Sequence, residues 1–97
     1  MNALDPVHPG EILEEEFIKP LGLSAYRMAA MLHVPRTRVE RLVRGETPVT
    51  LDTALRLARL FGTTAQFWIN LQTRYDLLTR APALEAELQS IEPLATA

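Results

Sequence analysis

Arginines are concentrated in one short stretch of the chain, where their guanidinium groups suit contact with phosphates or with the acceptor atoms of bases. Residues 27–44 carry five arginines and a single acid, Glu40, whereas residues 1–16 carry five acids and no lysine or arginine. The net charge of the chain is −2, but a phosphate backbone responds to the local field rather than to the total. The distribution favours nucleic-acid binding, and two oppositely charged solvated faces are the alternative interpretation.

These arginines fall within a pattern of two short helices separated by a tight turn, between Ser24 and Gly45. Ser24 is a good N-cap, Pro35 suits a position at or near the start of the second helix, and Gly45 suits the residue after its end. The layout is typical of a helix-turn-helix, whose second helix enters the major groove of DNA. His33 stands in the turn where glycine is usual, and a left-handed backbone is uncommon for histidine. A helical hairpin with a solvated basic face is the alternative.

The second helix of this pair has an apolar face and a basic face. At about 100° per residue, the residues of the inner face are Val39, Leu42 and Val43. The outer face carries Thr37, Arg41 and Arg44, and Arg36 and Arg38 lie on the two flanks. Arg41 is the first candidate for a bidentate contact to guanine and Arg36 the next, while Thr37 suits a thymine methyl or a phosphate. Arginines on the flanks of the helix more naturally grip phosphates. The predicted DNA-binding residues are Arg27, Arg36, Thr37, Arg38, Arg41 and Arg44.

Helical spacing dominates the rest of the chain, and no strand pattern stands out. Further helices are expected over residues 9–19, from about 50 to 61 and from about 64 to 80, and the spacing of a short helix recurs over 83–92. Pro20 and Gly22 are expected to end the first of these helices. The predicted fold is therefore all-α: a five-helix, repressor-like helix-turn-helix domain over residues 1–80, with a short C-terminal helical extension in the tail over residues 81–97.

Enzymatic and metal chemistry is not expected. The chain has no cysteine, and its two histidines, His8 and His33, have no acid or histidine at metal-ligand spacing. Glu14, Glu15 and Glu16 spread around a helix and are better interpreted as a solvated face. No catalytic residue, metal or cofactor is predicted. Without cysteines, a signal peptide or a long apolar run, the expected location is the cytoplasm, with no membrane contact.

A strip of large apolar residues suggests self-association. It consists of Phe67, Trp68, Leu71, Tyr75 and Leu78. Five short helices are too few to bury all of these groups, and an excess apolar strip often marks a partner surface. A homodimer held by the C-terminal half is therefore predicted, and packing within one core is the alternative for each aromatic.

Beyond these local patterns, the chain resembles the HigA-type antitoxins, which are helix-turn-helix proteins related to phage repressors of the XRE class and are also described as plasmid-maintenance antidotes. The resemblance is carried by HPGEILEEEFIKPLGLS (8–24), by the helix-turn-helix itself and by TLDTALRLARLFGTTAQFWINLQTRYDL (50–77). It runs from His8 to about Leu78. The departures are His33 in the turn and the tail beyond Thr79.

The resemblance implies a function. HigA-type antitoxins neutralise a HigB-type toxin, a ribosome-dependent mRNA endonuclease, and as dimers they bind palindromic operators and repress their own operon. The implied partners are an operator duplex, a cognate toxin and a second copy of the chain. Many relatives are solitary, so a transcriptional regulator without a toxin is one alternative. A protein-interaction module that has lost DNA binding is another, which the arginines of the second helix disfavour.

The acidic N-terminal surface is the expected site for a basic toxin, since opposite charges speed encounter. It comprises Asp5, Glu11, Glu14, Glu15 and Glu16. This surface is expected to keep the toxin away from the arginine-bearing helix, so that one dimer holds toxin and DNA together. The alternative is that the acids only maintain solubility and repel non-specific nucleic acid.

Overall fold

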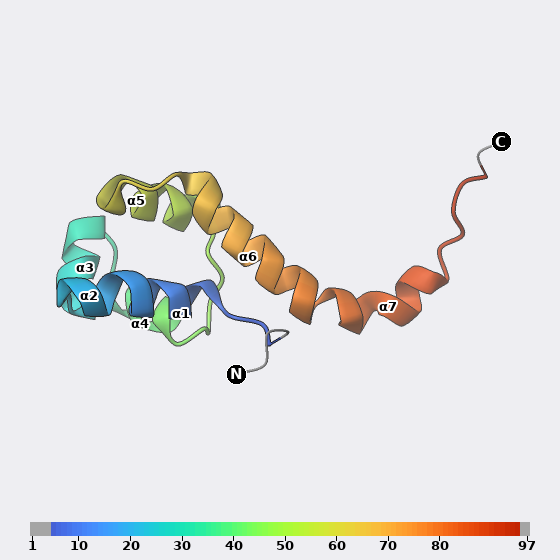
Figure 1. Ribbon diagram of the computed structural model, residues 1–97, viewed down its shortest axis with the longest axis horizontal. Coiled ribbons are helices and arrows are strands. Elements are labelled where there is room, and N and C mark those ends of the chain that lie inside the picture. The colour runs from blue at the N-terminus through green and yellow to red at the C-terminus, as the bar shows by residue number, and fades with distance from the viewer. Residues whose placement is uncertain (1–4, 96–97) are drawn as a thin grey trace.

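The chain folds into helices that cluster at one end and extend as an arm at the other (Figure 1). The computed structural model describes residues 5–95. The helices are α1 (Pro9–Leu13), η1 (Glu14–Ile18), α2 (Lys19–Leu21), α3 (Ala25–Leu32), α4 (Arg36–Val43), α5 (Leu51–Phe61), α6 (Ala65–Thr79) and α7 (Ala81–Gln89). Because α1, η1 and α2 form one continuous run, residues 5–95 contain six helices. The all-α class is confirmed. The count is six instead of the five predicted for the domain, because the C-terminal extension forms a nine-residue helix of its own, at Ala81–Gln89.

The first helix ends before Gly22, as predicted, but it continues through Pro20, beyond its predicted last residue at position 19. In a regular α-helix, proline has no N–H to donate and its ring meets the carbonyl four residues earlier. Here the preceding turn, Glu14–Ile18, is π-helical and therefore wider. This wider turn accommodates Pro20, and the run ends at Leu21, before Gly22 with its left-handed φ of 63°.

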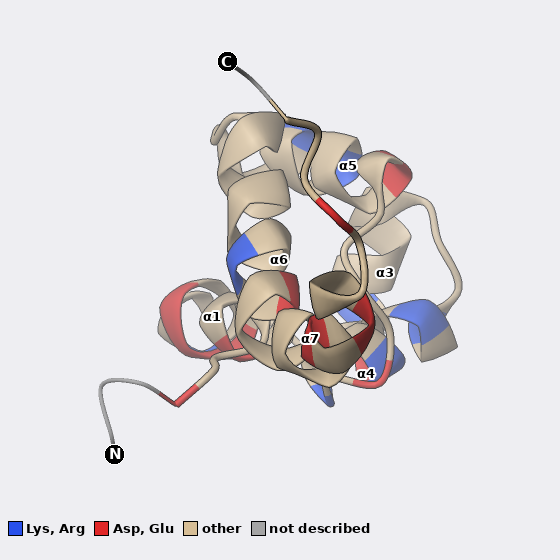
Figure 2. Cartoon of the chain, turned by 90° about the vertical axis from the view of Figure 1, so that its right-hand side faces the viewer, with Lys and Arg blue, Asp and Glu red and all other residues tan. Residues whose placement is uncertain are grey.

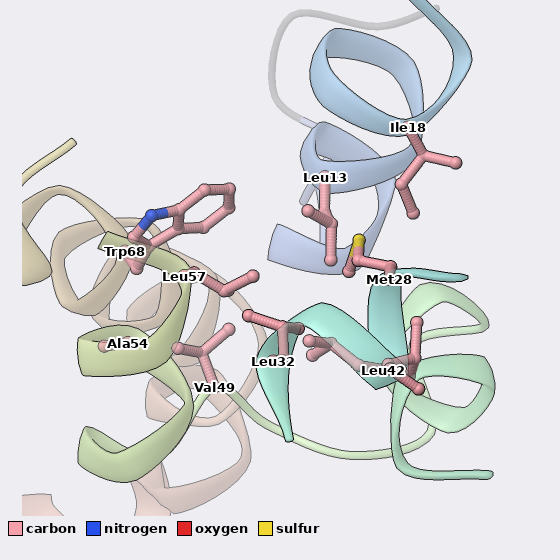
Figure 3. Close-up of a cluster of buried hydrophobic side chains, with 11 residues drawn as sticks. Leu13, Ile18, Met28, Leu32, Leu42, Val49, Ala54, Leu57 and Trp68 are labelled. Atoms are coloured by element: carbon pink, nitrogen blue, oxygen red, sulfur yellow. The ribbon is translucent and has the colours of Figure 1, made fainter. Parts of the chain in front are cut away.

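One hydrophobic core joins the clustered helices (Figure 3). Trp68 of α6 is fully buried, and its indole Nε1 donates to the Thr63 hydroxyl at 2.8 Å. The Trp68 ring lies 5.2 Å, centroid to centroid, from the ring of Phe17. Leu13, Met28 and Leu57 are also fully buried. For Trp68, the core alternative is therefore the correct one.

The arm consists of the second half of α6 together with α7, and it gives the molecule its long dimension of 56 Å against 29 and 21 Å. Pro82 occupies the first turn of α7, where its missing N–H is not needed. The apolar residues Leu84, Leu88 and Ile91 are 49%, 47% and 63% exposed. This apolar surface is therefore uncovered. Of the strip predicted on α6, Trp68 is buried and Leu71 packs against the core, whereas Phe67 and Leu78 are exposed.

The start of α1 lies directly against the end of α4. A Cβ atom added to Gly10 would stand 1.9 Å from the carbonyl oxygen of Leu42. No residue with a side chain fits at position 10 unless one of the two helices moves. Gly10 thus sets the distance between α1 and the second helix of the helix-turn-helix.

His8 connects this contact to α6. Its Nδ1 accepts a hydrogen bond from the backbone N–H of Gly10 at 2.9 Å and so caps α1. The edge-on ring contact with Tyr75 of α6 has a centroid distance of 4.9 Å. Burial lowers the pKa of His8, although the backbone of Thr47 and the charge of Asp76 act in the opposite direction. The folded protein therefore favours neutral His8, whose unprotonated Nδ1 is the atom that caps the helix.

This arrangement predicts a loss of stability in mild acid. Below the unfolded pKa of about 6.5, the unfolded chain takes up a proton at His8 that the folded chain resists, so the free energy of unfolding falls with pH. His8→Asn keeps a capping side chain without a titrating ring. Thermal melts between about pH 7.5 and 5.5 should show a smaller decline for this variant than for the wild type. His33→Asn, at an exposed position, is the control and should decline like the wild type. Parallel curves for all three proteins would contradict the role of His8.

Candidate nucleic-acid interface

The helix-turn-helix is formed by α3, the turn after it and α4. The Ser24 hydroxyl caps α3 by accepting the N–H of Arg27 at 3.0 Å. His33 adopts the left-handed conformation, with φ 59° and ψ 45°, and the N–H of Val34 returns to the Ala29 carbonyl at 3.0 Å. Pro35 then precedes the first residue of α4 in an extended conformation. The predicted turn is confirmed, with histidine supplying the conformation that glycine usually provides.

The end of α4 is closed by Gly45, whose φ is 75°. The N–H of Gly45 donates to the Leu42 carbonyl at 3.0 Å, and the N–H of Glu46 donates to the Arg41 carbonyl at 2.9 Å. This pair of bonds is the Schellman motif, which satisfies carbonyls that a helix end leaves free. The predicted role of Gly45 is confirmed.

The two faces of α4 lie as predicted from its sequence. Val39 and Leu42 are buried in the core and Val43 packs against it. The exposed residues of α4 and of the residue that follows it are Arg36, Thr37, Arg41 and Arg44. Arg27 is exposed on the preceding helix α3. The structure thus presents five of the six predicted DNA-binding side chains to solvent.

The exposed arginines of this face are only weakly held by the protein. Arg36 lies 3.4 Å from Glu40, and Arg44 lies 3.3 Å from Glu46, in both cases at the surface. Exposed pairs of this kind contribute little free energy, so phosphates can replace the carboxylates. The side chain of Arg41 makes no hydrogen bond or ion pair with any residue between 5 and 95. Its guanidinium group is available for an external partner.

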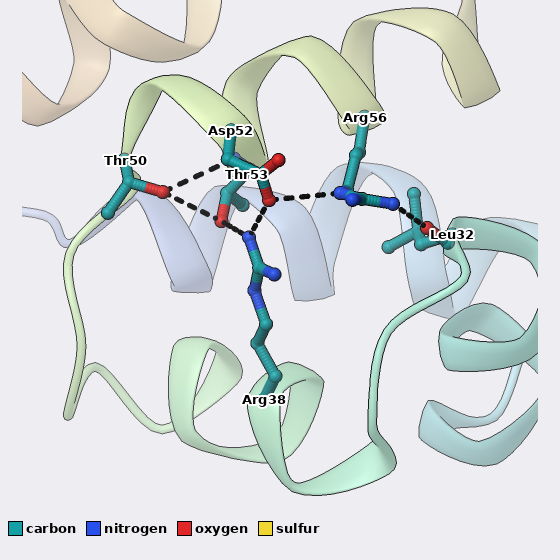
Figure 4. A network of polar contacts seen from close by, with 6 residues as sticks. All are labelled: Leu32, Arg38, Thr50, Asp52, Thr53 and Arg56. Atoms are coloured by element: carbon teal, nitrogen blue, oxygen red, sulfur yellow. Dashed lines mark hydrogen bonds and ion pairs between the residues drawn. The ribbon is translucent and has the colours of Figure 1, made fainter.

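Arg38 has a different environment, because its side chain turns toward the start of α5 (Figure 4). Its Nη2 donates to the Asp52 carboxylate and, at 2.8 Å, to the Thr53 hydroxyl. The same Asp52 oxygen accepts from Nε of Arg56 at 2.9 Å, and Nη1 of Arg56 donates to the Leu32 carbonyl at 2.8 Å. We call Arg38, Asp52 and Arg56 the Asp52 cluster. The hydrogen bonds from Arg38 and then Arg56 lower the pKa of Asp52, so the carboxylate is ionised at neutral pH.

Sequence reasoning did not identify the Asp52 cluster. The spacing of Asp52 and Arg56, four residues apart on a helix, is a signal that would have found that pair. The contact between Arg38 and Asp52 spans 14 residues and two helices, so no local pattern contains it.

One residue of the acidic N-terminal surface, Glu14, lies beside α4. Glu14 lines a groove together with Ile18, Val43 and Arg44, between η1 and the end of α4. Glu15 pairs with Lys19 at 2.8 Å, and this hydrogen bond raises the pKa of Lys19. Figure 2 shows acidic residues around α1 and basic residues around α4. A partner on the acidic surface would therefore touch the frame that holds α4.

Among residues 5–95, no group of three or more histidine, aspartate or glutamate side chains is arranged to hold a metal ion. No helix in that range is long and apolar enough to cross a membrane.

Comparison with known proteins agrees with this geometry. The profile of the helix-turn-helix family matches residues 15–68. Virulence-associated protein I of Dichelobacter nodosus is 49% identical over 98 residues, covering 98% of this chain and 87% of that protein. Antitoxin HigA-1 of Vibrio cholerae is 34% identical, over 92% of this chain and 84% of its own length.

A solved structure extends the likeness to the fold. The structure of Pseudomonas aeruginosa antitoxin HigA with the higBA promoter superposes with a TM-score of 0.87 at 41% identity, covering 94% of this chain and all of that one. The family profile spans more than half of the chain, and the antitoxin relatives span nearly all of it. The chain therefore belongs to the helix-turn-helix family, among proteins of the HigA antitoxin type.

Proposed function

We propose that this protein is a dimeric, sequence-specific DNA-binding repressor of the cytoplasm, and that it is the antitoxin of a HigB-type toxin whose operon it regulates. The observation that carries the proposal is the solvent-facing arginine surface of α4, held on a capped and tightly packed helix. The promoter complex of the 41% identical Pseudomonas aeruginosa antitoxin supports the same use of the fold.

The geometry of α4 gives each exposed side chain a role in this proposal. Arg41, on the outer face and unpaired within residues 5–95, is assigned to a guanine, and Arg36 at the start of the helix to a second base or a phosphate. Thr37 suits a thymine methyl or a phosphate. Arg27 and Arg44 are assigned to phosphates, which fix the register of the protein on the duplex.

Removing the Arg41 guanidinium should weaken and relax operator recognition. Arg41→Ala should cost about 1–3 kcal/mol on the specific duplex and flatten the preference at one base position. Fluorescence anisotropy with a duplex from the promoter upstream of the gene, and with single-base variants of it, measures both effects. Arg59→Ala, an exposed arginine of α5, is the matched control and should bind like the wild type. If Arg41→Ala also binds like the wild type, α4 does not read the bases.

The uncovered arm supplies a surface for the dimer. Its exposed apolar side chains are Leu77, Leu78, Leu84, Leu88, Ile91 and Leu94. An apolar surface of this extent is unfavourable in water, and burying it against a second copy removes that cost. A two-fold dimer would place the two α4 helices on successive turns of one DNA face, about 34 Å apart.

Charges placed on the arm should separate the dimer. Wild-type protein at tens of micromolar is expected to scatter light as twice the 10.9 kDa mass of one chain. The double variant Leu84→Glu, Leu88→Glu should scatter as a monomer with the same helical content, because α7 lies outside the core. Leu55→Glu, an exposed leucine of α5, is the control and should remain dimeric. If the double variant and a chain truncated after Leu78 both stay dimeric, residues 79–97 are dispensable for the interface.

The antitoxin part of the proposal is supported by the family relationship, and a solitary regulator is the competing function. The two are separated by expressing this chain with a small basic toxin encoded beside it. Wild-type protein should restore growth, and Arg41→Ala should restore it equally, because neutralisation proceeds by protein contact and not through α4 and DNA. Arg41→Ala should meanwhile lose repression of a promoter reporter. Failure of the wild type to restore growth would favour the solitary regulator.

A further inference from the structure

The Asp52 cluster joins α5 to both helices of the helix-turn-helix. Arg38 comes from the first turn of α4, Asp52 from the first turn of α5, and Arg56 reaches the Leu32 carbonyl at the end of α3. One carboxylate oxygen of Asp52 accepts from both arginines. Neutralising Asp52 would therefore release two cations at once.

The two arginines are held but not buried. The side chains of Arg38 and Arg56 are each 38% exposed, and that of Asp52 is 54% exposed. Arg38 lies on the same helix as Arg36 and Arg41, which the proposed function places against DNA. A guanidinium group in this position, once freed from Asp52, is within a side chain's length of the surface that faces the phosphates.

We propose that Asp52 is a specificity-determining residue. Its carboxylate pairs with Arg38 and Arg56, and these pairs prevent the two arginines from binding phosphates of any DNA sequence and orient α4. This inference rests on the proposed function, in which α4 reads DNA. It gives Arg38 a positioning role in place of the phosphate contact predicted from sequence.

If Asp52 restrains the two arginines, removing its charge should increase both the affinity for DNA and the dependence of that affinity on salt. Each phosphate neutralised by a protein cation adds about 0.9 to the slope of log K against log salt. Released arginines, together with the loss of a negative charge beside them, should strengthen binding to any duplex. If the Asp52 cluster only stabilised the position of α4, removing the Asp52 charge would instead weaken binding to every DNA sequence, because α4 would be less firmly held.

The test compares Asp52→Asn, which keeps the shape of the side chain and removes its charge, with the wild type. Affinity is measured for the promoter duplex and for a random-sequence duplex of equal length, between about 50 and 200 mM salt. Asp52→Asn should bind the random duplex about five- to tenfold tighter at the lower salt, with a slope steeper by about 1–2. The ratio of promoter to random affinity should fall.

Two further variants isolate the cause. Adding Arg38→Gln to Asp52→Asn should return the slope toward the wild-type value, since one released cation is gone. Glu15→Gln breaks another exposed ion pair, with Lys19, on the first helix and should leave the specificity ratio unchanged. Thermal melts record any loss of stability separately.

The outcomes distinguish this inference from the proposed function. An unchanged slope in Asp52→Asn, or a parallel loss of affinity for both duplexes, overturns the role of Asp52 while wild-type preference for the promoter upholds DNA reading by the protein. If the wild type shows no preference and Arg41→Ala changes nothing, the proposed function itself fails.

Discussion

The contact between the backbone of Gly10 and the carbonyl of Leu42 is the constraint on which the placement of α4 depends. A helix of eight residues is too short to be stable alone in water, so α4 owes its existence and its orientation to its neighbours. Burial of Val39 and Leu42 supplies the attraction, and the close backbone approach at Gly10 fixes how near α1 can come. His8 caps the start of α1 beside this contact, and the Schellman motif at Gly45 closes the end of α4. The outward face of α4 is therefore held in place, because the opposite side of the helix has no room to move toward α1.

Local patterns in the sequence were sufficient for the helix-turn-helix and insufficient for what supports it. Ser24, Gly45 and the apolar stripe of α4 act through bonds and contacts a few residues apart, and each was predicted correctly. The end of the first helix was misplaced, because the π-helical turn that accommodates Pro20 has no established sequence signal. The close approach at Gly10 also went unpredicted, since it depends on a residue 32 positions away that only the tertiary fold brings near.

In the candidate site, too, the sequence predicts the features that depend on local spacing and misses those that depend on contacts between helices. The outward face of α4 follows from helical periodicity, which is why Arg36, Thr37, Arg41 and Arg44 were found from sequence. The pattern could not show that Arg38 has a carboxylate partner on another helix. Arg38 and Arg41 lie on the same short helix but have different environments. Arg38 faces a carboxylate on α5, and Arg41 faces solvent.

Because α6 is one continuous helix, its length would set the distance between the two α4 helices of a dimer joined by the arms. The first half of this helix is anchored in the core through Trp68 and to the α4–α5 loop through Gln72, whose amide oxygen accepts the Val49 N–H at 2.7 Å. Its second half continues without a break as the first part of the arm. In a dimer joined by these arms, each added residue in α6 would lengthen the connection by about 1.5 Å and rotate it by about 100°. Insertions in multiples of a full turn would therefore change the distance between the two α4 helices of such a dimer, whereas an insertion of one residue in each copy would also rotate both α4 helices relative to the DNA.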